Sequence, residues 1–216
     1  MKIKWATTVQ SFPIDPKEAK HEAQRILDEV KPAAIISVEK VGPNEKGIYH
    51  TGLGNDMGAS SSKFDILVEE AKKKGVLTIG FVDLGNEVGA GFIFDAIRKV
   101  LPLGPKCTCG CGGGIASVCE TDVGVLACKC NWAAYGVEAA LAGVLKNPNI
   151  MHTPEDEKRI HFECLRAGMF DGVTLTPTLS LCGIPISITN GVIQLLRDLV
   201  EVGLTTPPKP DKLGRY

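Results

Sequence analysis

Apolar residues recur along the chain with a helical period in some segments and as continuous runs in others. Residues 16–29 show the 3.6-residue period of an amphipathic helix, and Pro16 and Asp15 suit its first turn and its N-cap. The apolar positions of that segment are Ala19, Ala23, Ile26 and Leu27. The unbroken apolar run at 33–38 is typical of a buried parallel strand. Residues 16–38 are therefore predicted to form a helix followed by a strand.

The same alternation continues along the sequence. Strands are expected at residues 4–9, 33–38 and 76–82, with further apolar segments at 115–118 and 123–128. Helices are expected at residues 16–29, 61–74, 93–100, 131–145, 154–167 and 190–202. Strands separated by helices favour parallel pairing with right-handed crossovers. The predicted fold class is α/β, a mostly parallel sheet with helices on both faces and active-site loops at the carboxyl ends of the strands.

Length and composition add a domain assignment and exclude some partners. The 216 residues, 44% of them hydrophobic, predict one α/β domain over residues 1–204 and a Pro-rich C-terminal tail over 205–216. A net charge of −1 without a long block of like charge argues against nucleic-acid binding. No apolar stretch reaches the roughly 20 residues of a membrane span, and no secretory signal is present, so a soluble, cytoplasmic protein is expected.

Acidic residues stand close to three of the expected strands. Glu39 follows the segment at 33–38, Asp83 follows the strand at 76–82, and Asp122 adjoins the apolar segment at 123–128. Ligands of parallel sheets bind at the carboxyl ends of the strands, where the connecting loops meet. The three acids are therefore expected to gather at that edge and to form the functional site.

The loop after the strand at 76–82 is the richest in chemistry. Asp83, Asn86 and Glu87 lie within five residues, and Gly85 lets the backbone approach a ligand. The two carboxylates and the amide could hold a hard divalent cation through oxygen. Alternatively, one carboxylate orients a substrate while the other moves protons. The plainer interpretation is a strand-to-helix turn whose acids only cap the next helix.

Two further segments supply candidate binding residues. The Gly-rich loop at 47–56 offers His50 and Asp56 on a flexible backbone, although an isolated histidine is often only a surface residue. Asn131 and Trp132 stand where a strand passes into a helix, and a helix N-terminus offers free amides to an anionic group. The plain alternative is an N-cap asparagine beside a core tryptophan.

The eight cysteines, in a chain without an export signal, favour reduced thiols or a metal role. Cys107, Cys109 and Cys111 precede three glycines, and their spacing departs from the paired Cys-x-x-Cys of most structural zinc sites. Three such thiols could still bind a soft metal with a fourth cysteine as the last ligand. The fourth ligand would be Cys119, Cys128 or Cys130. The alternative is a set of reduced thiols in a tight loop.

Five segments resemble the D-glutamate cyclase family. They are residues 38–43, 47–50, 80–89, 121–135 and 171–174, which occur in the family's order. The most specific is the Asp-x-Gly-Asn-Glu-[ILV]-Gly run at 83–89. The resemblance implies a lyase (hydro-lyase) that interconverts D-glutamate and 5-oxo-D-proline, and the mammalian member of the family is manganese-dependent and mitochondrial.

Taken with the resemblance, these patterns assign roles to the candidate residues. The catalytic candidates are Glu87, Asp83 and Asn131, the substrate-binding candidates Asn86, His50, Asp56, Gly85 and Trp132, and the metal ligands Glu39, Asp83, Glu87 and Asp122. The expected cofactor is Mn²⁺ or Mg²⁺, and the expected partners are a small-molecule substrate and either a second copy or a separate subunit. The alternatives are another metal-dependent hydrolase or isomerase acting on a small carboxylate or cyclic amide, and a non-catalytic binding subunit of a larger enzyme.

Overall fold

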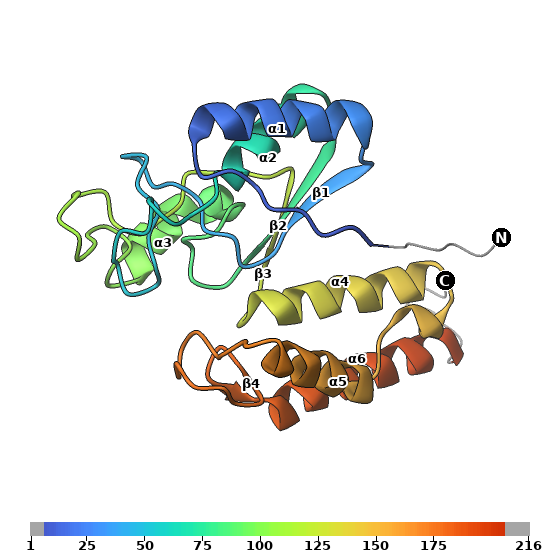
Figure 1. Cartoon of the computed structure of the whole chain (residues 1–216). Coiled ribbons are helices and arrows are strands. Elements are labelled where there is room, and N and C mark those ends of the chain that lie inside the picture. Colours follow the sequence, from blue (N-terminus) through green and yellow to red (C-terminus); the bar gives the residue numbers. More distant parts are fainter. Residues whose placement is uncertain (1–6, 206–216) are drawn as a thin grey trace, which may run out of the picture. The chain divides into compact units, whose positions relative to one another are not determined.

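The computed structural model describes residues 7–205, which divide into two compact units, the first ending at Cys130 and the second beginning at Asn131 (Figure 1). The elements of the first unit are α1 (Pro16–Glu29), β1 (Ala34–Ser37), α2 (Phe64–Lys73), β2 (Leu77–Val82), the 3-10 turn η1 (Ala90–Ile93), α3 (Phe94–Val100) and β3 (Val123–Leu126). Those of the second are α4 (Cys130–Val144), η2 (Pro148–Ile150), α5 (Pro154–Arg166), β4 (Ser180–Leu181), β5 (Ile184–Pro185) and α6 (Ile186–Thr205). The single domain expected over residues 1–204 stays a prediction.

The first unit is built on a parallel sheet with the strand order β1-β2-β3. Ala34 pairs with Leu77 and Ile79 pairs with Val123, so all three strands run in one direction. Their carboxyl ends therefore lie at one edge, and the segments after β1 and β2 leave from that edge. The predicted α/β class and parallel sheet are confirmed.

Helices α1 and α2 pack together beside the sheet (Figure 1). Asp15 accepts hydrogen bonds from the amides of Lys17 and Glu18, which caps α1, and Pro16 occupies its first turn. The buried core that joins these helices to β1 contains Ala23, Leu27, Ile35, Leu67, Val68 and Ala71. The predicted helix at 16–29 is confirmed at both ends.

Local interactions shift or remove several other predicted elements. Helix α2 begins at Phe64 with Lys63 at its N-cap, so the cap predicted at Ser61 and Ser62 lies too early. The Ser61 hydroxyl accepts a hydrogen bond from Lys40, and its carbonyl accepts one from Lys63. The apolar segment at 115–118 forms no strand and bonds to loops instead, its Ser117 amide donating to the Gly85 carbonyl. Of the strand expected at 4–9, residues 7–9 are not in a strand and the rest lies outside the described residues.

The second unit is mainly helical. Its core contains Tyr135, Ala139, Ala142, Met151, Ile193 and Val200. Helix α5 begins with a capping box between Thr153 and Asp156, close to the predicted start of that helix. Helix α6 starts earlier than the predicted 190, directly after the unpredicted β4–β5 hairpin. It also includes Thr205, which the sequence assigned to the tail; the remaining tail at 206–216 lies outside the described residues. No helix within residues 7–205 has the length and apolar character that crossing a bilayer requires.

Candidate functional site

Two acids meet at the carboxyl edge of the sheet. Asp83 directly follows β2, and Glu39 lies two residues beyond the end of β1 with a left-handed φ of 56°. Carboxylate oxygens of Glu39 and Asp83 and the Sγ atom of Cys130 all lie within 4.8 Å of one another. A non-glycine residue in the left-handed region costs free energy, so the neighbouring structure must hold Glu39 in place. The structure thus brings together the two acids that follow β1 and β2.

Glu87 is the buried member of this acid cluster, which we define as Glu39, Asp83 and Glu87. Its side chain is only 3% exposed, and its two oxygens accept hydrogen bonds from the Leu84 amide at 3.0 Å and the Gly85 amide at 2.7 Å. Burial, and then a hydrogen bond with the Asp83 carboxyl, raise the pKa of Glu87 to about 7. Glu87 is therefore a carboxyl group able to give or take a proton near neutral pH.

The backbone around Glu87 is fixed by the segment after β1. The amide of Gly42 donates to the Asn86 carbonyl at 2.8 Å, and the amide of Val88 donates to the Lys40 carbonyl at 2.7 Å. Beyond Glu87 the loop turns back over β2, and a Cβ atom on Gly80 would lie 2.7 Å from the Cα of Gly89. Only glycine fits such an approach. The acid loop is therefore rigidly placed against the sheet.

Cys130 lies beside the acids, and its sulfur is softer than the oxygen ligands that a hard cation prefers. Its buried thiol donates to the Phe81 carbonyl at 3.1 Å, and burial, followed by the charges of Glu39 and Asp83, raises its pKa. The carboxylates of Glu39 and Asp83 are the atoms that suit a hard cation such as Mn²⁺ or Mg²⁺, which binds one or two carboxylates and completes its shell with water and substrate.

Asp122 lies at the opposite edge of the sheet, which corrects the expectation that it joins Glu39 and Asp83. It precedes β3, and its Oδ2 accepts hydrogen bonds from the amide and the hydroxyl of Thr78, each at 2.8 Å. Thr78 stands near the start of β2, five residues before Asp83, which corresponds to about 16 Å along a strand. Asp122 fastens the amino ends of two strands and does not meet the acid cluster.

The substrate-binding candidates of the first unit have largely structural contacts. Asn86 is buried and its side-chain amide donates to the His50 carbonyl at 2.8 Å. Asp56 is exposed and accepts a hydrogen bond from the Gly58 amide at 2.7 Å, which closes a turn. Gly85 has a φ of 86° and gives its amide to Glu87. Their predicted contacts with substrate stay predictions.

His50 belongs to a second cluster, together with the three cysteines of the loop at 107–111. The ligand atoms of His50, Cys107, Cys109 and Cys111 all lie within 4.8 Å of one another, an arrangement that could hold a metal ion. The sequence offered Cys119, Cys128 or Cys130 as the fourth member, but Cys119 is buried in the core beside α1 and α2. No sequence pattern relates His50 to a loop that lies 57 or more residues further along the chain.

Asn131 and Trp132 belong to the second unit. Asn131 lies inside the first turn of α4, since the helix starts at Cys130, whose amide donates to the Asp83 carboxylate at 3.3 Å. Trp132 packs against the core of the second unit, and its buried indole nitrogen has no hydrogen-bond partner among the described residues. Their catalytic and binding roles stay predictions.

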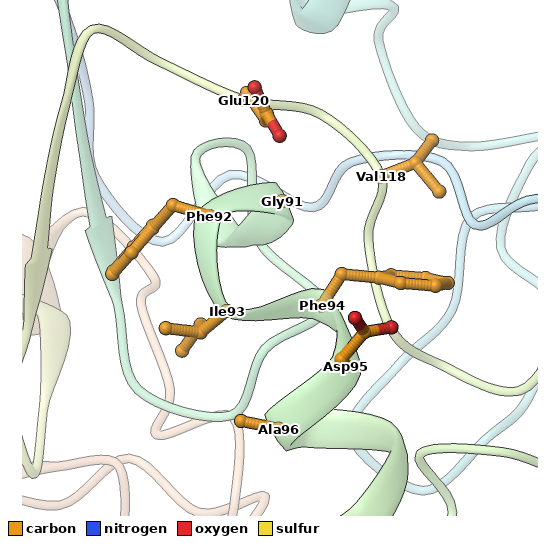
Figure 2. A pocket seen from close by; sticks show the side chains of 8 residues that line it. All are labelled: Gly91, Phe92, Ile93, Phe94, Asp95, Ala96, Val118 and Glu120. Atoms are coloured by element: carbon orange, nitrogen blue, oxygen red, sulfur yellow. The ribbon is translucent and has the colours of Figure 1, made fainter.

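A cleft of about 550 Å³ lies elsewhere in the first unit, between η1, the start of α3 and the segment that carries Val118 and Glu120. Figure 2 shows its lining, with Phe92 in the short turn η1, Phe94 at the start of α3 and Asp95 next to Phe94. None of the predicted site residues lines this cleft. The acid cluster, rather than this open cleft, is where groups able to transfer protons and to bind a cation converge.

The parallel sheet and the acids at its carboxyl edge define an α/β protein with a cluster of carboxylates where the loops after neighbouring strands meet. Residues 4–197 match the family described as D-glutamate cyclase-like, C-terminal. Because that match covers most of the 216 residues, the chain belongs to this family. The resemblance found in the sequence is thereby confirmed.

A curated relative is D-glutamate cyclase, mitochondrial, of Homo sapiens. It is 28% identical to this chain over 108 residues, which are 50% of this chain and 16% of the human protein. The matched part thus spans about one sixth of the length of that relative.

Proposed function

We propose that the chain is a hydro-lyase that interconverts D-glutamate and 5-oxo-D-proline at the acid cluster. The observation that carries this proposal is the convergence of Glu39 and Asp83 from neighbouring strand ends, beside the buried carboxyl of Glu87. Membership of the D-glutamate cyclase-like family supports the same substrate class.

Closing the ring of glutamate requires its amine nitrogen to attack its side-chain carboxyl carbon. The nitrogen loses a proton, a C–N bond forms, and one carboxyl oxygen leaves as water after gaining a proton. Glu87 is the group we assign to this proton transfer, because burial and the neighbouring Asp83 raise its pKa to about 7. In the hydrolytic direction the same side chain would take a proton from the attacking water.

Glu39 and Asp83 are the residues that would hold a divalent cation, since two convergent carboxylates suit Mn²⁺ or Mg²⁺. Such a cation, when bound, would supply positive charge to the oxygen of the tetrahedral intermediate. Asp122 is omitted from this set, because Thr78 holds it at the opposite edge of the sheet.

Proton NMR of the full chain with 5-oxo-D-proline or D-glutamate tests this function, with and without Mn²⁺. Metal-dependent interconversion that Glu39→Gln abolishes is the expected result. Glu69→Gln is the matched control, since Glu69 is exposed on α2 and has no place in the cluster. No turnover by the folded, manganese-supplied chain would reject the assignment to glutamate. Turnover of another cyclic amide would then point to a different metal-dependent hydrolase.

A further inference from the structure

Four ligand atoms converge between two loops of the first unit. The Nε2 atom of His50 lies 3.2 Å from the Sγ of Cys109 and 3.6 Å from the Sγ of Cys111. The Sγ of Cys107 lies 3.3 Å from that of Cys109 and 3.2 Å from that of Cys111. One imidazole and three thiols thus surround a single point, a set we call the His-Cys cluster.

Disulfide bonding does not explain the short sulfur–sulfur distances. A disulfide joins its sulfurs at about 2.05 Å, whereas all three cysteines of the cluster are free. Ordinary hydrogen bonding also explains His50 poorly. Its ring is fully buried, its Nδ1 has no hydrogen-bond partner among residues 7–205, and its Nε2 faces only thiols. Burying an imidazole in this way costs free energy unless a stronger interaction compensates.

We propose that His50, Cys107, Cys109 and Cys111 bind one zinc ion as a closed, structural site. Three thiolates and one imidazole are an established ligand set for tetrahedral zinc, and four protein ligands leave no open position for a substrate. Soft thiolates favour zinc over Mn²⁺ or Mg²⁺, so this site and the acid cluster select different metals. Zn–S bonds of about 2.3 Å place tetrahedral sulfurs about 3.8 Å apart, so the thiols need to separate by only about half an ångström.

The surroundings of the cluster suit thiolate ligands. The side-chain amide of Asn44 and the backbone amide of Gly113 each lie 3.4 Å from the Sγ of Cys111 and donate to it. Asn44 also donates to the Gly114 carbonyl at 2.7 Å, which fixes its orientation. Such donors to the ligands of a metal are part of how proteins build metal sites.

Glycines allow the two loops to bring these ligands together. Gly110 and Gly112 have φ values of 83° and 77°, which fold the loop so that three alternate residues present sulfur to one point. On the other loop, a Cβ atom on Gly54 would lie 2.9 Å from the Thr108 amide, and the Gly54 carbonyl accepts from the Cys109 amide at 3.2 Å. The metal would therefore join two loops that already touch.

Zinc at this site would also stabilise the acid loop. The carbonyl of His50 accepts the hydrogen bond of Asn86, the residue directly before Glu87. Fixing His50 through its imidazole fixes this carbonyl as well. This consequence rests on the proposed function, whereas zinc binding itself does not.

The test begins with the metal content of the purified full chain, measured by inductively coupled plasma mass spectrometry. One zinc per chain is expected in the wild type, with loss of zinc in Cys109→Ser, whose exposed position tolerates serine. Cys164→Ser is the matched control, because Cys164 lies in the second unit, and it should keep its zinc. Equal loss in both variants would overturn the assignment.

Cobalt replacement tests the ligands without any variant. The wild-type chain loaded with Co²⁺ should show the strong visible bands of a tetrahedral site and the near-ultraviolet bands of thiolate coordination. A folded chain that takes up neither zinc nor cobalt, or that is purified with iron and the visible colour of an iron–sulfur cluster, would refute the proposal. Zinc content is measured without substrate, so this outcome is separate from any failure of the lyase assay.

Discussion

The side-chain amide of Asn86 donates a hydrogen bond of 2.8 Å to the backbone carbonyl of His50. This bond connects two clusters of different chemistry, because Asn86 precedes Glu87 of the acid cluster and His50 is the nitrogen ligand of the His-Cys cluster. The side-chain amide of Asn86 therefore links the loop that carries Glu87 to the backbone of His50.

Replacing Asn86 with alanine should destabilise the chain by about 1–3 kcal/mol, because the buried His50 carbonyl loses its partner. Urea unfolding followed by circular dichroism measures this change. Zinc content should stay at the wild-type level, since no metal ligand is altered. A stable Asn86→Ala chain with unchanged turnover would show that this hydrogen bond does not position the acid loop.

Glu87→Gln should lower turnover by about 100- to 10,000-fold while the fold is retained, because the amide cannot exchange a proton. Glutamine has nearly the same shape, and its carbonyl oxygen can still accept one of the two backbone hydrogen bonds from Leu84 and Gly85. The rate of interconversion of D-glutamate and 5-oxo-D-proline, followed by proton NMR, measures the effect. Glu69→Gln should match the wild type, and a fully active Glu87→Gln chain would remove Glu87 from the reaction.

Helix α1 and the meeting of Glu39 with Asp83 were predictable because their causes are local or follow from topology. The N-cap Asp15, Pro16 and the apolar period lie within one segment of the sequence. Acids that directly follow two paired parallel strands must lie at the same edge. These parts of the site needed no knowledge of long-range loop contacts.

The remaining parts depend on contacts that sequence periodicity does not encode. Asp122 is not one of these parts: it stands before β3, so the direction of a parallel strand alone places it at the amino edge, where Thr78 binds it. His50 reaches the cysteines through two irregular loops whose approach depends on Gly54 fitting against Thr108. The spacing of the cysteines indicated three possible ligands, but only the folded structure shows that His50 lies beside them.

Asp122→Asn distinguishes the metal-binding role that the sequence suggested from the structural role that the fold gives this residue. A metal ligand would be essential, whereas a residue that fastens two strand ends should leave turnover close to the wild-type rate. The hydrogen bond from the Thr78 hydroxyl, and then that from its amide, hold the pKa of Asp122 below its ordinary value. Its stabilising effect should therefore be present above the unfolded pKa of about 3.8 and be lost in acid. Urea unfolding at neutral and acidic pH, together with the NMR assay, tests both statements.

We expect His152 to make the stability of the second unit depend on pH. Its Nδ1 lies 2.7 Å from Glu138 and its Nε2 lies 3.4 Å from Glu157. The interaction with Glu157 raises the pKa of His152, burial opposes that effect, and Glu138 raises it further. The pKa of His152 is higher in the folded state than its unfolded value of 6.5. Its contribution to the free energy of unfolding is therefore fully present below pH 6.5, and it is lost as the pH rises through the folded pKa.

The free energy of unfolding of the wild type should therefore exceed that of His152→Gln most clearly below pH 6.5, and the difference should shrink in alkaline solution. Urea titrations at several pH values measure it. The matched control is the same substitution at His21, which is exposed on α1 of the first unit. If the difference in free energy of unfolding between the wild type and His152→Gln grew as the pH rose, the assigned role would be contradicted, because the pH dependence would have the opposite sign.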